Sequence, residues 1–234
     1  MIEKETIFLT FQQALEAVCI DFRRYAPQVM LFSEVLRVIS NGKAVINKDR
    51  EKEGRWVAAE PGSKMVWVNG TALGEYVCRA LHEKDLEADI IVSVCSRVFQ
   101  TRTFKGRDPE SGLAGVFIET GMETFSCRQC GDCCNFLDYH DALTQMDVER
   151  WQQLGRQDIL DWVSIFRTPN GKPGYRIWVE PETGEMIDRC PFLKHLPDEN
   201  RWLCRIHDVK PGICREYPVS RKHGLMTGCP GFSI

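Results

Sequence analysis

Apolar residues in the first part of the chain recur at the spacings typical of helices and strands. Between Phe8 and Arg24 they return every three or four residues, which predicts an amphipathic helix that ends before Pro27. Residues 29–39 show a similar spacing and are predicted to form a second helix. A short strand is expected at residues 64–68, where it runs into an Asn-Gly turn.

The same region continues with one more helix and a β-branched stretch. Thr71 is predicted to cap a helix that extends to His82 with its apolar side chains on one face. Residues 90–104 are rich in β-branched side chains and are expected to be extended, with a helix as the alternative. Residues 108–112 form a turn or linker, and residues 113–119 are expected to be a strand. We therefore expect a mixed α/β region at residues 1–110.

The pattern of apolar residues is weaker in residues 111–234, where the predicted elements are short. Thr144 and Asp147 have the spacing of a capping box, and Gly155 should end the helix that they begin. Another short helix is predicted at residues 158–166, and a hairpin around Pro181–Gly184. Because so small a core is rarely stable alone, we expect metal to stabilise this part. The predicted fold class is α+β: the mixed region, then a small, irregular, cysteine-rich domain.

Cysteines stand out in this second region. Eight of the eleven in the chain lie there, at Cys127, Cys130, Cys133, Cys134, Cys190, Cys204, Cys214 and Cys229. The charged N-terminus has no apolar signal-peptide core, so a cytoplasmic location is expected. In that reducing compartment, clustered thiols are more typical of metal sites than of disulfides, although a redox-active dithiol remains an alternative.

The spacing of the first three thiols suggests an iron–sulfur cluster. Cys127-x2-Cys130-x2-Cys133 matches the start of a bacterial ferredoxin run, in which three loop cysteines bind three corners of a [4Fe–4S] cluster. The fourth ligand there commonly lies in a distant Cys-Pro pair, which Cys190 supplies here. Gly131 suits a loop that has to curl around the sulfur atoms.

The remaining thiols suggest a second site. In extended backbone the side chain of Cys134 would point away from that of Cys133, so we expect it to join a set with Cys204, Cys214 and Cys229. The expected cofactors are one or two [4Fe–4S] clusters, with Zn²⁺ as the alternative because it requires only four N or S ligands. His207 follows Cys204 at the spacing of a zinc knuckle and is a further candidate ligand.

The rest of the composition narrows the range of partners. The formal net charge of -3 indicates no bulk attraction to nucleic acid, and no apolar run is long enough to span a membrane. The basic residues between 205 and 223 are interpreted as a solvated face, with charge compensation of a cluster or capture of an acidic partner as alternatives. Cys19, Cys78 and Cys95 lie in apolar contexts and are interpreted as buried packing thiols. A phosphate-binding loop, a dinucleotide fingerprint and a His-Glu-x-x-His motif are all lacking in residues 1–110.

The order of these motifs resembles the CxxCxxCC, or YkgJ-like, cysteine-cluster family, whose domain is described as chelating zinc or iron. The resemblance runs from Phe125 through the cysteine run, Cys190-Pro191, Cys204-Arg-Ile-His207 and Lys210-Pro211 to the end of the region. It implies a metal-binding role for all eight cysteines at residues 111–234. The family also includes flagellin lysine N-methylases, which resemble iron–sulfur proteins that use S-adenosylmethionine.

Three functions follow as hypotheses. The first is a [4Fe–4S] protein that transfers electrons or assists a larger redox enzyme, with a protein partner. The second is a structural zinc module that presents an interaction surface. The third is an S-adenosylmethionine-dependent protein methyltransferase, which would need a cofactor pocket built partly by residues 1–110. The sequence does not decide whether the protein is an enzyme.

Overall fold

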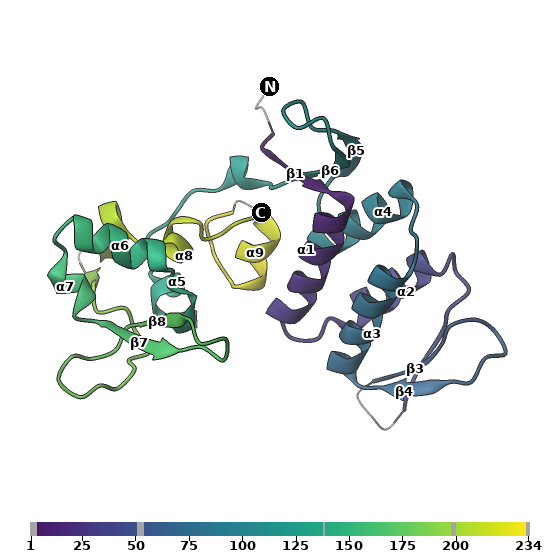
Figure 1. The fold of residues 1–234 in the computed structure, drawn as a ribbon, viewed down its shortest axis with the longest axis horizontal. Coiled ribbons are helices and arrows are strands. Elements are labelled where there is room, and N and C mark those ends of the chain that lie inside the picture. Colours follow the sequence, from purple (N-terminus) through teal and green to yellow (C-terminus); the bar gives the residue numbers. More distant parts are fainter. Residues whose placement is uncertain (1–3, 51–53, 138, 198–199, 233–234) are drawn as a thin grey trace. The chain divides into compact units, whose positions relative to one another are not determined.

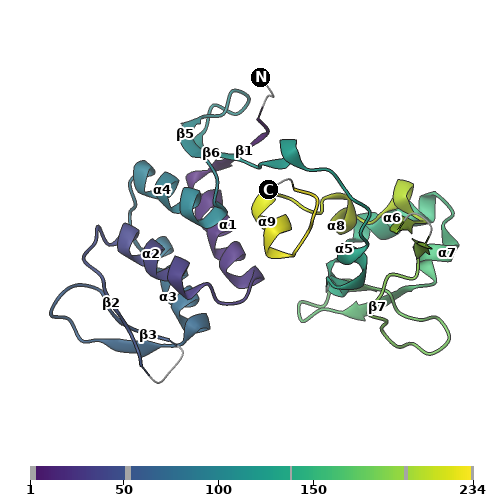
Figure 2. The same cartoon turned by 180° about the vertical axis from the view of Figure 1, so that it is seen from behind.

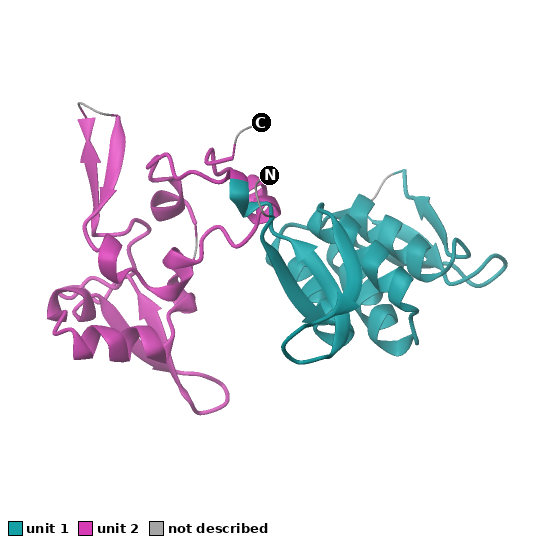
Figure 3. Ribbon diagram, turned by 90° about the horizontal axis from the view of Figure 1, so that it is seen from above, with its two compact units in different colours: residues 1–123 teal, residues 124–234 magenta. Residues whose placement is uncertain are grey.

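The computed structural model describes residues 4–50, 54–137, 139–197 and 200–232. The chain forms two compact units, residues 1–123 (unit 1) and residues 124–234 (unit 2), which Figure 3 shows in different colours. Both units combine helices with small antiparallel sheets, which confirms the predicted α+β class. None of the helices in the described ranges is long and apolar enough to cross a membrane.

Unit 1 consists of a core of packed helices and two three-stranded antiparallel sheets (Figures 1 and 2). Its elements are β1 (Thr6–Thr10), α1 (Phe11–Arg24), α2 (Val29–Ile39), β2 (Val45–Lys48), β3 (Arg55–Ala58), β4 (Val66–Val68), α3 (Gly70–Glu83), α4 (Ala88–Phe99), β5 (Thr103–Arg107) and β6 (Ala114–Glu119). The strand orders are β1-β6-β5 and β2-β3-β4. The four helices pack together through one apolar cluster, which also includes Val116 and Ile118 of β6.

The predicted helices of unit 1 form, with shifted starts. Phe8 belongs to β1, and the first helix begins at Phe11 because Thr10 and Gln13 make a capping box. The helix at residues 29–39 is confirmed as α2. Asn69, rather than Thr71, caps α3: its side chain accepts a hydrogen bond from the Ala72 N–H at 2.7 Å. The capping residues thus determine where each helix begins, while the apolar stripe determines which side of the helix packs against the core.

The extended conformation favoured for residues 90–104 is wrong. This stretch contains most of α4 and only the start of β5. Ile91, Val94, Cys95 and Val98 are all buried in the core, at the spacing of one helical face. Burial of this apolar stripe outweighs the extended preference of β-branched side chains, which is a weak and context-dependent effect.

Unit 2 consists of short elements and two hairpins. They are η1 at the unit boundary (Met122–Thr124), α5 (Asp132–Asn135), η2 (His140–Ala142), α6 (Gln145–Gln153), α7 (Gln157–Leu160), β7 (Val163–Arg167), β8 (Pro173–Ile177), β9 (Leu193–Leu196), β10 (Arg201–Cys204), η4 (His207–Val209), α8 (Gly212–Arg215) and α9 (Arg221–Met226). β7 pairs with β8, and β9 pairs with β10. A second apolar cluster fills the unit, with Trp151 fully buried at its centre and its indole N–H bonded to the Val209 carbonyl at 2.8 Å.

Two expectations for unit 2 need correction, and one is confirmed. Thr144 and Asp147 form the predicted capping box of α6. The helix expected at residues 158–166 ends at Leu160, because residues 163–167 pair as β7. Around Pro181–Gly184 the chain forms a short turn with one β-bridge, Val179–Met186. The strand before this turn, β8, forms its longer hairpin with β7.

Candidate metal centre

The cysteine run forms a tight loop that leads into a single helical turn. Gly131 has φ +80° and precedes α5, and its carbonyl accepts the N–H groups of Cys134 and Asn135. Because Cys133 and Cys134 are helical, their side chains do not point in opposite directions, and the expectation of extended backbone here is wrong. Their Sγ atoms lie 3.9 Å apart. The two neighbouring thiols therefore face one common space.

The β9–β10 hairpin, from later in the sequence, contacts this loop. The backbone N–H of Trp202, in β10, donates to the Gln129 carbonyl at 2.8 Å. The Trp202 indole lies so close to Gly131 that a Cβ there would stand 2.7 Å from Trp202 Cγ. Gly131 is therefore required twice, for its positive φ and for the close approach of the indole.

Cys190 and Cys204 come to the same place at the two ends of this hairpin. The Cys190 N–H donates to the Cys134 carbonyl at 3.2 Å, which ties the segment before β9 to α5. Cys204 is the last residue of β10, and both thiols belong to the apolar cluster of unit 2. Burial raises the pKa of Cys190 to about 12 and also raises that of Cys204. Both side chains thus lie in a poorly solvated environment that disfavours a free thiolate.

Tyr139 lies beside four thiols of the site. Its hydroxyl donates to the Cys133 carbonyl at 2.8 Å and interacts with the Cys214 side chain. Burial raises the pKa of Tyr139, and the nearby thiols of Cys214, Cys134, Cys133 and Cys190 raise it further. Cys204 in turn influences the titration of both Cys190 and Cys214. Five thiols from three separate segments are thereby brought together: Cys133, Cys134, Cys190, Cys204 and Cys214.

Asp147 positions the segment that carries Cys214. It is only 4% exposed, and besides its capping role its Oδ1 accepts the Gly212 N–H at 2.7 Å. Arg215 Nη2 lies 3.8 Å from the same oxygen. The sequence predicts the cap from the Thr-x-x-Asp spacing, but not this second role. No local pattern marks a bond between residues 65 positions apart.

The other predicted ligands lie toward the edge of this group. Cys127 is exposed, and Cys130 is half-buried, with its pKa raised mainly by burial. Cys229 interacts with Tyr217, whose pKa burial raises to about 12 and which Cys133 also influences. The Ser126 N–H donates to the Gly231 carbonyl at 2.8 Å, which brings the chain at Cys127 toward the segment with Cys229. His207 starts η4 with an exposed side chain, and its role as a ligand stays a prediction.

Two basic residues of the segment 205–223, Lys210 and Lys222, differ in their surroundings. Lys210 lies close enough to lower the pKa values of Cys133, Cys204 and Cys214 against the larger effect of burial. Its positive charge therefore favours thiolates at these positions. Lys222 is only 4% exposed, so the interpretation of residues 205–223 as a wholly solvated face is wrong at that position.

The chemistry of the gathered residues fits a thiolate-bound metal. Two thiolates on one tetrahedral ion at Zn–S distances of ~2.3 Å stand ~3.8 Å apart, close to the separation between Cys133 and Cys134. The indole N–H of Trp178 is buried in the same apolar cluster without a hydrogen-bond partner among the described residues, and sulfur would be a suitable acceptor. No three His, Cys, Asp or Glu side chains of the described ranges already surround one point, so binding requires the thiols to rotate inward.

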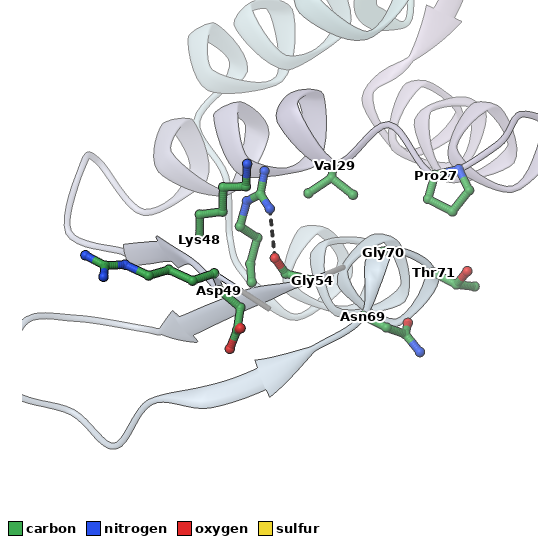
Figure 4. A pocket seen from close by; sticks show the side chains of 10 residues that line it. Pro27, Val29, Lys48, Asp49, Gly54, Asn69, Gly70 and Thr71 are labelled. Carbon is green, nitrogen blue, oxygen red and sulfur yellow. Dashed lines mark hydrogen bonds between the residues drawn. The ribbon is translucent and has the colours of Figure 1, made fainter. Parts of the chain in front are cut away.

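A separate pocket of about 710 Å³ lies in unit 1 (Figure 4). Lys48, Asp49, Gly54, Asn69 and Gly70 line it, and a hydrogen bond from Arg55 to the Gly54 carbonyl crosses one side. It contains no thiol, so it is not part of the cysteine cluster. The methyltransferase hypothesis would need a cofactor pocket built partly by residues 1–110, and that hypothesis stays an alternative.

Comparison with protein families identifies the cysteine-rich unit. Residues 126–230 match the CxxCxxCC family, which is described as a "Putative zinc- or iron-chelating domain". The expected family is thus confirmed for this part of the chain, and the match supports metal binding by unit 2. Neither the curated proteins nor the solved structures contain a match to this chain.

Proposed function

We propose that the CxxCxxCC domain at residues 126–230 binds a [4Fe–4S] cluster and serves in electron transfer, or as an accessory to a larger redox enzyme, in the cytosol. The observation that carries this proposal is the gathering of thiols from separate segments, four of them beside Tyr139 and the fifth, Cys204, beside Cys190 and Cys214. One tetrahedral ion needs only four ligands, so the five gathered thiols, with three more cysteines at the edge, exceed a single zinc site. A cluster bound here would supply one-electron chemistry.

Cys127, Cys130, Cys133 and Cys190 are the proposed ligands of the cluster. Cys133 and Cys190 belong to the gathered thiols, and Cys130 stands beside Cys133 on the same loop. The loop from Cys127 to Gly131 would close over one side. Cys134, Cys204, Cys214 and Cys229 remain as the ligands of a second site, joined to the first through the bond from the Cys190 N–H to the Cys134 carbonyl.

The surroundings of the thiols support redox use. Cys134, Cys190 and Cys204 pack within the apolar cluster of unit 2, together with Trp178 and Phe192. Burial, backbone N–H groups and nearby charge set the potential of a thiolate-bound cluster. Lys210 would offset part of the negative charge of the thiolates.

Anaerobic purification followed by analysis of iron, acid-labile sulfide and zinc tests this proposal. We expect a brown protein that absorbs near 400 nm and contains iron and sulfide in equal amounts. Cys133→Ser should remove most of both, whereas Cys95→Ser, a buried thiol of unit 1, should leave them unchanged. A colourless protein with stoichiometric zinc and no sulfide would refute the iron–sulfur assignment.

A structural zinc site is the second candidate, and the Cys133–Cys134 contact favours it. In a cubane cluster each thiolate binds a different iron, so its ligand sulfurs stand farther apart than the 3.9 Å seen here, whereas two ligands of one zinc ion fit this distance. Zinc binding predicts a redox-silent protein in which chelators unfold unit 2. Cys134→Ser distinguishes two sites from one, because loss of only part of the metal indicates two.

A further inference from the structure

Unit 1 contains a pair of thiols that simple packing does not explain. Cys19 of α1 and Cys78 of α3 are 2% and 3% exposed, and they lie close enough for each thiol to shift the pKa of the other. The interpretation as buried thiols is therefore right about location. It does not account for two sulfur atoms meeting across the contact between α1 and α3.

A histidine stands next to this pair. His82 lies one helical turn after Cys78 on α3, and its Nε2 is 3.8 Å from Cys19 Sγ. With its own proton on Nδ1, the imidazole can accept the proton of Cys19 through Nε2. The His82 side chain is exposed at the surface, so a proton taken from the buried sulfur has a path to water.

The interaction between the two thiols divides their roles. Cys78 lowers the pKa of Cys19, and the positive charge of Arg23 lowers it further. Burial and the negative charges of Glu16 and Glu75 oppose this effect. The same interaction raises the pKa of Cys78, so that Cys78 keeps its proton. The thiolate therefore forms on Cys19, with a protonated partner beside it.

A small cavity reaches the Cys78 side of the pair. It has a volume of about 270 Å³ and is lined by Phe22, Tyr25, Phe32, Gly74 and Cys78 among others. Arg23 and Glu75 also line it, but its small volume favours a small molecule over a peptide disulfide. Hydrogen peroxide, or another small hydroperoxide, has the size that this cavity admits.

From these contacts we infer that Cys19, Cys78 and His82 form a redox-active dithiol that a small hydroperoxide oxidises to an intramolecular disulfide. The Cys19 thiolate attacks one peroxide oxygen, the O–O bond breaks, and the leaving hydroxide takes the proton held by His82 to form water. Cys19 is then a sulfenic acid. The Cys78 sulfur attacks it, the S–O bond breaks, and the Cys78 proton leaves with the hydroxide as a second water. Two thiols and one peroxide thus give one disulfide and two waters.

Site-resolved mass spectrometry of the full chain tests this inference without depending on the metal site. The protein is treated with hydrogen peroxide near neutral pH, its remaining thiols are blocked in denaturant, and it is digested without reduction. We expect a linked pair of peptides containing Cys19 and Cys78. We also expect free Cys19 to disappear at least about tenfold faster than Cys95, whose pKa burial raises to about 12.

Three variants sharpen the assignment. Cys78→Ala should leave a sulfenic acid on Cys19 that dimedone traps, and His82→Gln should slow oxidation at pH 7 and shift its pH profile upward. Cys95→Ser, the matched control, should leave the rate unchanged. Equal rates for Cys19 and Cys95 in the unaltered protein, or no linked peptide under oxidation, would overturn the proposal whether or not the variants fold.

Discussion

Asp147 offers the most direct test of how unit 2 positions its thiols. Its buried carboxylate accepts hydrogen bonds from the Thr144 N–H and hydroxyl at 3.2 Å and 2.6 Å, and from the Gly212 N–H at 2.7 Å. It therefore joins the start of α6 to the start of α8, which carries Cys214. Substituting Asp147 removes the acceptor of the Thr144 N–H and a long-range link at once, while the Thr144 side chain still caps the helix.

The magnitude follows from the groups left without a partner. The backbone N–H groups of Thr144 and Gly212 both lose their acceptor, and each donor left unsatisfied costs about 1–3 kcal/mol. We expect Asp147→Ala to lower the free energy of unfolding of unit 2 by roughly 3 kcal/mol or more, which corresponds to a fall in Tm of roughly 12 °C for a domain near 100 residues. Asp147→Asn keeps one acceptor oxygen for Gly212 and should cost about half as much.

The assay is denaturant and thermal unfolding of the full chain, followed by far-UV circular dichroism, together with metal content per chain. Glu149→Ala is the control, because Glu149 is an exposed residue of the same helix and its loss should cost under about 0.5 kcal/mol. Asp147→Ala should also lower metal retention under a chelator, since Cys214 loses its anchor. An Asp147→Ala protein within about 0.5 kcal/mol of the parent, with unchanged retention, would refute this reasoning.

Three further predictions concern single side chains. Gly131→Ala should destabilise unit 2 by about 2–4 kcal/mol in chemical denaturation, because it adds a clash with the Trp202 indole to the strain of a positive φ. Gly184 has a similar φ but open space around it, so Gly184→Ala should cost only about 1 kcal/mol. Equal losses of stability in the two variants would contradict the clash. Tyr139→Phe removes the hydrogen bond to the Cys133 carbonyl and should lower the free energy of unfolding of unit 2 by about 1–2 kcal/mol. The variant should also release metal to a chelator faster than the parent. An unchanged rate of release would argue against a role for Tyr139 at the site. Burial raises the pKa of Cys95 to about 12, so this thiol stays neutral in folded unit 1 at pH values where it would ionise in the unfolded chain. The free energy of unfolding of unit 1 should therefore decline as the pH rises from 9 toward 12, by up to roughly 4 kcal/mol. Cys95→Ala should flatten that decline in urea titrations at stepped pH, and parallel stability curves for the variant and the parent would contradict the linkage.

Local patterns were enough for much of the secondary structure. The capping box of α6 could be predicted because its two partners lie three residues apart, and α2 because its apolar stripe is regular. The same reasoning failed at residues 90–104, where residue preference and spacing disagreed and burial favoured the helix. It failed again at residues 163–167, whose pairing with β8 no local pattern encodes.

The sequence by itself determined which chemistry unit 2 offers: eight thiols in ordered motifs, enough to predict the family and a metal-binding role. Only the tertiary structure decided which thiols meet, because Cys134, Cys190 and Cys214 approach through bonds between distant segments, such as that from Asp147 to Gly212. It also paired Cys19 with Cys78 and His82, which helix packing brings together from positions about sixty residues apart. Ligand types are local properties of a chain, whereas distances between them depend on the packing of the whole fold.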